Sequence, residues 1–128
     1  MKERYIKVLK VEPKSAPVVH TLKNELTALQ DAVSIGADDR GLIEVIDLND
    51  TACILCNEES KMIGLEPNRR FFDDILCGVF YVVGQNRCRE FVSLSEEQIT
   101  QYSQIFANID TFSEGEVEKT IFTQFIVI

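Results

Sequence analysis

Hydrophobic and polar residues alternate with a period of two in several short segments, a pattern that predicts β-strands. Tyr5–Glu12 is rich in β-branched and aromatic residues and predicts the first strand, and Val18–Leu22 predicts a return after a proline-containing turn. Leu42–Leu48 and Thr51–Asn57 predict two more strands, joined by a tight Asn-Asp turn. The first half of the chain is therefore expected to be mainly β-structure.

Two apolar segments in the second half also predict strands. Ile75–Val83 is the most apolar stretch and is expected to be a central strand, in which Gly78 indicates a bulge or a close approach of other backbone. Val117–Ile128 alternates again, but with apolar residues on both faces. This second segment predicts a strand that is buried on both sides or paired at its edge with another subunit.

Two segments have the spacing of amphipathic helices. Apolar residues recur every three or four positions over about residues 24–35, with Asn24 as the expected N-cap. A second helix is expected over 96–107, where Ser95 and Gln98 have the spacing of a capping box. Each helix is predicted to turn one face toward the core.

The expected fold class is α+β. The chain of 128 residues predicts a single domain with a mostly antiparallel sheet that the two helices cover on one face. Residues 1–108 are expected to form this domain, and 109–128 a C-terminal extension that adds a strand to the same domain or to a subunit interface. The apolar end Phe125–Ile128 favours a homodimer.

The charge balance limits the partners that the chain can have. It carries 21 acidic and 13 basic residues, a net charge of −8, which argues against direct binding of nucleic acid. The acidity fits an ordinary soluble surface. It also fits a protein that imitates nucleic acid and so binds a basic protein partner. No apolar run approaches the roughly 18 residues that a membrane span needs, so no membrane contact is expected. Because no signal peptide is recognisable, the expected location is the cytoplasm.

The cysteines and the histidine do not predict a metal or catalytic centre. Cys53 and Cys56 have a two-residue gap, but in a strand they point to opposite faces. Cys77 and Cys88 do not repeat that spacing, and His20 is the only imidazole. No metal, cofactor or catalytic residue is therefore expected, and the cysteines are interpreted as small buried hydrophobes.

Carboxylates leave one enzymatic alternative open. Asp73 and Asp74 are adjacent, and neighbouring side chains of an extended segment diverge, so they are not expected to share a proton or a metal. A small hydrolase or transferase that uses Glu58 or Asp73 remains an alternative, because one carboxylate in a deep pocket can act as a general acid or base.

The polar loop between residues 57 and 70 is the best candidate for a binding site. Two adjacent arginines suit phosphate or carboxylate, so the loop predicts a pocket for an anionic small molecule or for protein carboxylates. The alternative is that the arginines pair internally with Glu58, Glu59 or Asp73. The residues expected to form the ligand-binding site are Asn57, Glu58, Glu59, Lys61, Gly64, Asn68, Arg69 and Arg70.

Four segments carry a family resemblance: Ile6–Pro13, Ala52–Arg70, Asp74–Gly84 and Ser93–Tyr102. They resemble, in this order, the motifs of an uncharacterised family, domain of unknown function 3846, over about residues 5–106. The chain departs from that family at Ser34–Gly41, where the family usually has two glycines and a tyrosine. The resemblance implies an origin in phages, plasmids or integrated elements of Gram-positive gut bacteria and their relatives, without implying a mechanism.

The expected function is that of a non-enzymatic accessory protein of a phage or mobile element. It would act by binding in the cytoplasm of the host bacterium, where it would sequester an anionic, nucleotide-like signal or a host protein. Such binding could counteract a defence system of the host. An acidic inhibitor that mimics nucleic acid and a small carboxylate-dependent hydrolase are the alternatives.

Overall fold

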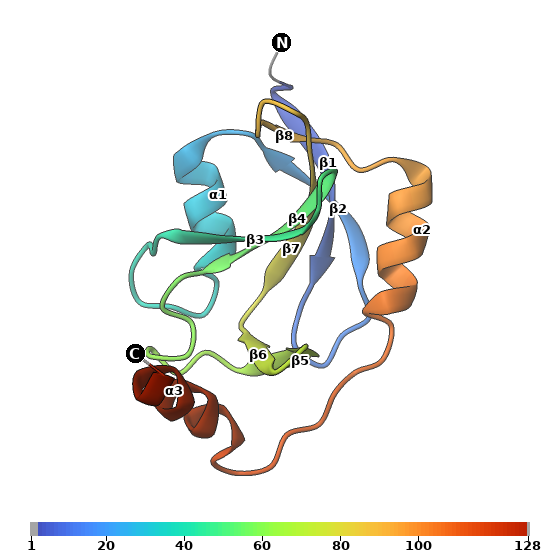
Figure 1. Cartoon of the computed structure of the whole chain (residues 1–128). Helices are drawn as coiled ribbons and strands as arrows, with labels where there is room; N and C mark the ends of the chain where they lie inside the picture. Colours follow the sequence, from blue (N-terminus) through green and yellow to red (C-terminus); the bar gives the residue numbers. More distant parts are fainter. Residues whose placement is uncertain (1–2, 128) are drawn as a thin grey trace.

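A computed structural model describes residues 3–127, with side chains up to residue 121. Its larger sheet has the strand order β2-β1-β7-β4-β3, with β8 paired to β7, and β5 and β6 form a separate hairpin (Figure 1). All strand pairs are antiparallel. The elements are β1 (Tyr5–Val11), β2 (Val18–Lys23), α1 (Leu26–Val33), β3 (Ile43–Asn49), β4 (Ala52–Asn57), β5 (Pro67–Phe71), β6 (Asp74–Cys77), β7 (Phe80–Gln85), β8 (Phe91–Val92), α2 (Glu96–Ile105) and α3 (Glu116–Val127).

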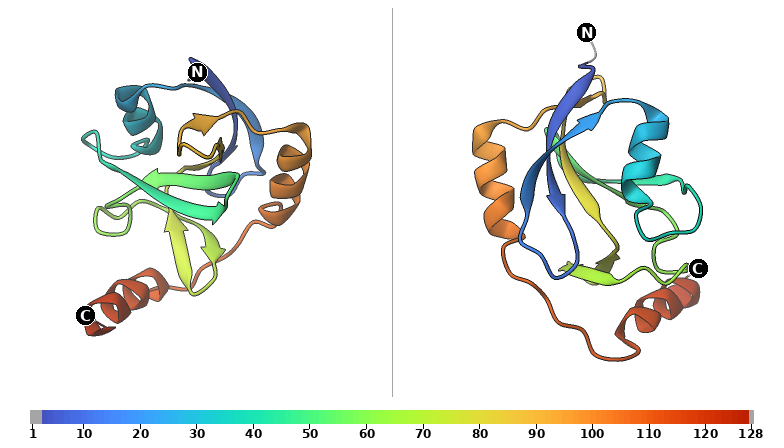
Figure 2. Two further views of the ribbon diagram at one scale, coloured as in Figure 1. Left: turned by 45° about the horizontal axis from the view of Figure 1, so that its top comes forward. Right: turned by 180° about the vertical axis from the view of Figure 1, so that it is seen from behind.

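The α+β class and the antiparallel sheet are confirmed, but the two expected helices lie on opposite faces of the sheet. Leu29 and Val33 of α1 pack with one set of alternating strand residues, and Tyr102 and Phe106 at α2 pack with the other set. Figure 2 shows the sheet between the two helices from behind. The expectation of cover on one face was wrong because every residue of β4 and β7 is buried, and strands buried on both sides need a layer on each face.

The apolar run Ile75–Val83 is divided between two strands instead of forming one. Gly78 has a positive φ of 73° and separates β6, in the hairpin, from β7, in the larger sheet. A Cβ atom at this position would lie 2.8 Å from Cδ1 of Leu65. Glycine is therefore required both by the backbone conformation and by the close approach of a side chain.

The C-terminal extension is also corrected, because residues 116–127 form helix α3 where a strand was expected. Val117, Ile121 and Phe125 also recur at the four-residue spacing of a helix, so the apolar pattern of this segment does not separate a strand from a helix. The segment Phe125–Ile128, on which the homodimer prediction rests, lies outside the residues whose side chains are described. None of the described helices is long and apolar enough to cross a bilayer.

The two helix starts differ from each other. Ser95 caps α2 as predicted: its Oγ accepts from the Gln98 N–H, and the Gln98 side chain accepts from the Ser95 N–H. Asn24 does not cap α1, whose N-cap residue is Glu25. Its amide instead donates to the carbonyls of Glu3 and Phe91 and so joins three segments of the chain.

Replacement of Gly78 by alanine is expected to destabilise the fold by about 1–3 kcal/mol more than the same replacement at Gly64. Both glycines have a φ near 74°, but no atom lies within 4 Å of a Cβ built at Gly64, so the pair isolates the contact with Leu65. Urea unfolding of the two variants measures the difference. Equal destabilisation of the two variants would show that the contact with Leu65 does not determine the cost of the Gly78 replacement. Adding Leu65→Ala to the Gly78→Ala variant should restore part of the lost stability.

Candidate functional site

Asn68, an expected ligand contact, is a buried structural residue. Only 1% of its surface is exposed, and its amide donates to the carbonyls of Val11, at 2.9 Å, and Gly78, at 2.8 Å. It therefore joins the end of β1 to the junction between β6 and β7. The carbonyl of the same side chain accepts a hydrogen bond from Arg69. Both ends of this amide are thus used within the fold.

Arg69 is buried in the same way, and its donors are satisfied by neutral oxygens of the protein. Nε donates to the carbonyl of Phe106, Nη2 to the carbonyl of Ser15 and Nη1 to Oδ1 of Asn68, over 3.1, 2.6 and 2.8 Å. Burial lowers the pKa of the guanidinium, which the charge of Asp110 partly offsets. The Phe106 carbonyl lies at the C-terminal end of α2, where a cation is favoured.

Arg70 is paired within the chain, but with the C-terminal segment and not with the acids that the sequence suggested. Residues 107–115, here called the strap, run from α2 to α3, and the Arg70 N–H donates to Asp110 Oδ2 at 2.8 Å. Its Nη2 donates to the Thr111 carbonyl, and the guanidinium lies 4.8 Å from the centre of the Phe112 ring. The same group forms an ion pair with Glu116. The backbone and the side chain of Arg70 thus fasten the strap and the start of α3 to β5.

The rest of the expected site does not converge on a shared ligand position. Asn57 is buried and donates to Ser34 Oγ, while its own Oδ1 accepts from the Glu59 N–H. Lys61 forms an ion pair with Asp74. The alternative that the two arginines pair with Glu58, Glu59 or Asp73 is not found among the described side chains: Arg69 donates to neutral oxygens, and Arg70 pairs with Glu116. The other members, Glu58, Glu59 and Gly64, are exposed on the loop surface.

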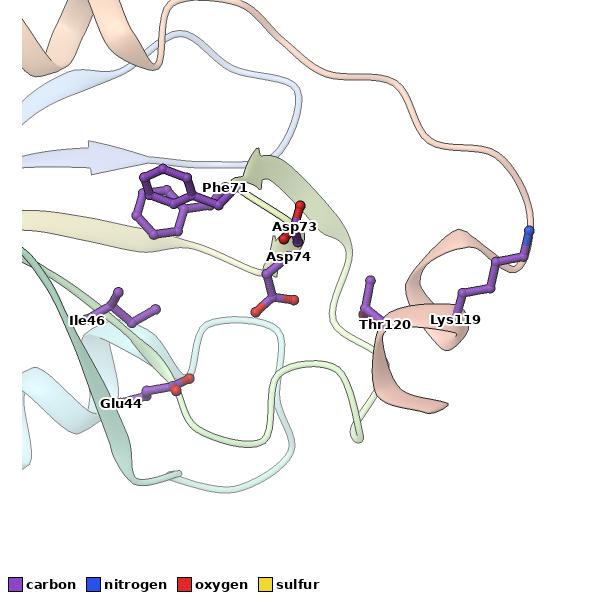
Figure 3. A pocket seen from close by; sticks show the side chains of 8 residues that line it. Glu44, Ile46, Phe71, Asp73, Asp74, Lys119 and Thr120 are labelled. Carbon is purple, nitrogen blue, oxygen red and sulfur yellow. The ribbon is translucent and has the colours of Figure 1, made fainter. Parts of the chain in front are cut away.

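A groove of about 600 Å³ lies between the sheet edge at β3, the β5–β6 hairpin and α3, and we call it the β3 groove. Figure 3 shows side chains of β3 on one side, those of the hairpin near the middle and those of α3 on the far side. Ile46 and Phe71 provide apolar surface, and both pack against the core. The lining residues are Glu44, Ile46, Phe71, Phe72, Asp73, Asp74, Lys119 and Thr120.

Three carboxylates, those of Glu44, Asp73 and Asp74, line the β3 groove together with Lys119, and the carboxylates differ in their partners. Asp74 accepts from Lys61 and from the Ile75 N–H. Glu44 and Asp73 belong to none of the ion pairs found among the described side chains. A cationic group in the groove could therefore approach the carboxylates of Glu44 and Asp73.

Phe72 is the least expected residue of the β3 groove. It lies in the turn between β5 and β6, its surface is 91% exposed, and its φ is 54°. A bulky residue with a positive φ is a backbone outlier, and an exposed aromatic ring gains nothing from the core. Its ring contacts Phe71 edge to face, with the centroids 4.8 Å apart. The turn therefore presents an apolar ring at the entrance to the groove.

Cys53, Cys56 and Cys77 are buried as expected, whereas Cys88 is exposed, and Cys56 contacts Glu44 of the β3 groove through its Sγ. Cys53 and Cys56 are buried on opposite faces of β4, as predicted, and burial raises the pKa of each thiol to about 12. Among the described residues, no three His, Cys, Asp or Glu side chains are placed to hold a metal. His20 lies on β2, at the far end of the strand order, where its ring faces Tyr81.

Sequence patterns identified Asp73 and Asp74 only as catalytic candidates and missed Glu44, Ile46 and Phe72. One signal was present: Phe71 and Phe72 are adjacent, and one of two neighbours in an extended segment must point away from the core. The contribution of α3 to the groove could not be foreseen, because a strand was expected in that segment.

Replacement of Arg69 by methionine is expected to lower the free energy of unfolding by about 3 kcal/mol, because it leaves buried acceptors without donors. Arg87→Met is the matched control: Arg87 is exposed, and its loss should change stability by less than about 0.5 kcal/mol. Chemical denaturation of both variants measures the difference. Equal stabilities would contradict the structural role of Arg69.

Release of the strap is expected in Glu116→Gln at neutral pH, because the ion pair with Arg70 is lost. The pKa of Glu116 is held at about 2, first by the Arg70 guanidinium and then by Ser113. A lowered acid pKa means that this attachment is complete above the ordinary value of 4.5 and is lost as the pH falls toward 2. Hydrogen exchange of residues 108–116 should accelerate in this variant but not in Glu114→Gln, an exposed neighbour. Equal rates in both would refute the attachment.

Comparison with known proteins places the chain in a family without assigning an activity. Searches of the curated proteins and of the solved structures give no match. A family model described as "Domain of unknown function (DUF3846)" matches residues 6–107, from β1 to the start of the strap. This match covers all the strands, α1 and α2, and leaves α3 outside. The chain belongs to the DUF3846 family.

Proposed function

We propose that the protein is a non-enzymatic binding protein whose β3 groove holds a basic and apolar segment of a partner protein. The observation that carries the proposal is the combination of an exposed, backbone-strained Phe72 with the carboxylates of Glu44 and Asp73 around apolar surface. An aromatic anchor provides apolar contact area, and carboxylates outside ion pairs select lysine or arginine side chains.

The charges of the chain favour a cationic partner over an anionic ligand. Asn68 and Arg69 form their hydrogen bonds with buried groups of the fold, and Arg70 binds the C-terminal segment. The net charge of −8 adds a long-range attraction for a basic protein. Of the partners that the sequence suggests, this supports a protein in preference to a nucleotide-like signal.

The biological setting forms part of the same proposal. We expect an accessory protein of a phage or mobile element, acting in the bacterial cytoplasm on a host protein, for example one of a defence system. This expectation rests on the family resemblance of the four sequence segments and on the acidity of the chain. A homodimer is compatible with it.

Selection from a random peptide display library tests the proposal and does not require an identified partner. The protein should enrich peptides in which lysine or arginine accompanies apolar residues, and Glu44→Lys should reduce their binding at least tenfold. Glu97→Lys, an exposed position outside the groove, is the charge-matched control and should retain binding. Enrichment of acidic peptides, no enrichment, or equal loss in both variants would refute the proposal.

A further inference from the structure

We infer that the partner segment binds as an added β-strand on the free edge of β3. The inference rests on the proposed function and specifies how the β3 groove is used. β3 is the last strand in the order of the larger sheet: β4 pairs with one edge, and no described strand pairs with the other. An unpaired edge presents backbone donors and acceptors that can bind an extended peptide.

The register identifies which backbone groups of β3 are free. The Glu58 N–H donates to the carbonyl of Leu42, so residues with even numbers direct their backbone groups toward β4. In an antiparallel pair the alternate residues direct theirs away from the partner. Ile43, Val45 and Asp47 therefore present N–H and C=O groups at the outer edge of β3.

The other side of β4 gives an independent check of this alternation. The Gln85 N–H donates to the carbonyl of Thr51, so the odd-numbered residues of β4 direct their backbone groups toward β7. The even-numbered residues of β4 must then face β3. The carbonyl of Glu44 agrees with this alternation, since it points toward β4 and lies 3.8 Å from the Sγ of Cys56.

The edge of β3 is open next to the β3 groove. Val45 is 47% exposed, and the bulge that disturbs the pairing begins only at Asp47. Neither proline nor lysine, the residues that commonly protect an edge, occurs in β3. Side chains of an added strand alternate between two faces, and those on the α2 side would meet Ile46, Phe71 and the groove carboxylates.

The charge of the β3 edge favours a basic partner over a second copy of this chain as the added strand. The charged residues of β3 are Glu44 and Asp47, of which Asp47 pairs with Arg89. Two such edges side by side would bring the Glu44 carboxylates of both copies to the same interface. A strand that alternates lysine or arginine with apolar residues would place opposite charges there instead. The other free edge, that of β2, contains Lys23 and no acid, so it lacks this complementarity.

The probe is an acetylated heptapeptide that alternates lysine and valine, with binding measured by fluorescence anisotropy. Val45→Pro removes an outward N–H without touching the ladder to β4, and proline is tolerated on edge strands. It should weaken binding at least tenfold, whereas Val45→Thr, which keeps the N–H, should stay within about twofold. The analogous peptide of glutamate and valine should not bind.

Two N-methylated forms of the same peptide test strand pairing with the wild-type protein, so the result does not depend on a variant that folds. Methylation of the alternate amides that face β3 should abolish binding, and methylation of the other set should leave it within about twofold. Equal effects of both sets, or full binding by Val45→Pro, would overturn strand addition.

The outcomes separate this inference from the proposed function. Peptide binding that depends on Glu44 but on neither Val45 nor the methylation pattern would leave the groove proposal standing and refute only strand addition. No binding of the heptapeptide or of any library peptide would refute both. Concentration-dependent dimerisation that Val45→Pro abolishes, measured by sedimentation, would identify a second copy as the occupant and overturn the basic partner.

Discussion

A guanidinium buried among neutral oxygens is the interaction on which the arrangement of the fold depends. Arg69 contacts the turn after β1 and the end of α2, and Asn68 beside it contacts the end of β1 and the start of β7. Removal of a charge from water is costly, and the cost is met here only because the surrounding segments supply their carbonyls. Each segment is held in place by its contribution to this cluster. The positions of the β5–β6 hairpin and of α2 relative to the sheet follow from it.

This structural use of Asn68 and Arg69 also determines the chemistry that remains at the surface. The loop that contains the most cations contributes little free positive charge, since Lys61 and Arg70 are paired as well. The hairpin that the buried pair positions carries Phe72 and Asp73 toward β3. The same constraint therefore removes an anion site and creates an acidic groove with an aromatic entrance. The burial of Asn68 and Arg69 therefore underlies both the fold and the proposed binding chemistry.

Strands β1 to β4 and the capped helix α2 could be predicted because their signals are local, whereas β5, in the segment expected to be a polar loop, and β8 were missed. Alternation gave the positions of the strand pairs, and the Ser95 capping box is a contact between residues three positions apart. The errors concern properties set by tertiary packing. An arginine has the same appearance in a sequence whether it is buried or exposed, and periodicity does not say which face of a sheet a helix covers. Gly78 was interpreted as a bulge or a close approach of other backbone within one strand, and not as a break between two strands, because the apolar run continues on both sides of it.

The position of β7 has a consequence for how the protein is made. β7 lies between β1 and β4, so the two N-terminal hairpins, β1–β2 and β3–β4, have no sheet contact with each other until residues 80–85 are available. During synthesis these hairpins leave the ribosome well before β7. A pair of isolated strands is marginal in water, so the sheet closes late and through contacts distant in sequence. For most of translation the apolar strands of the two hairpins therefore lack the neighbour that buries them in the finished sheet.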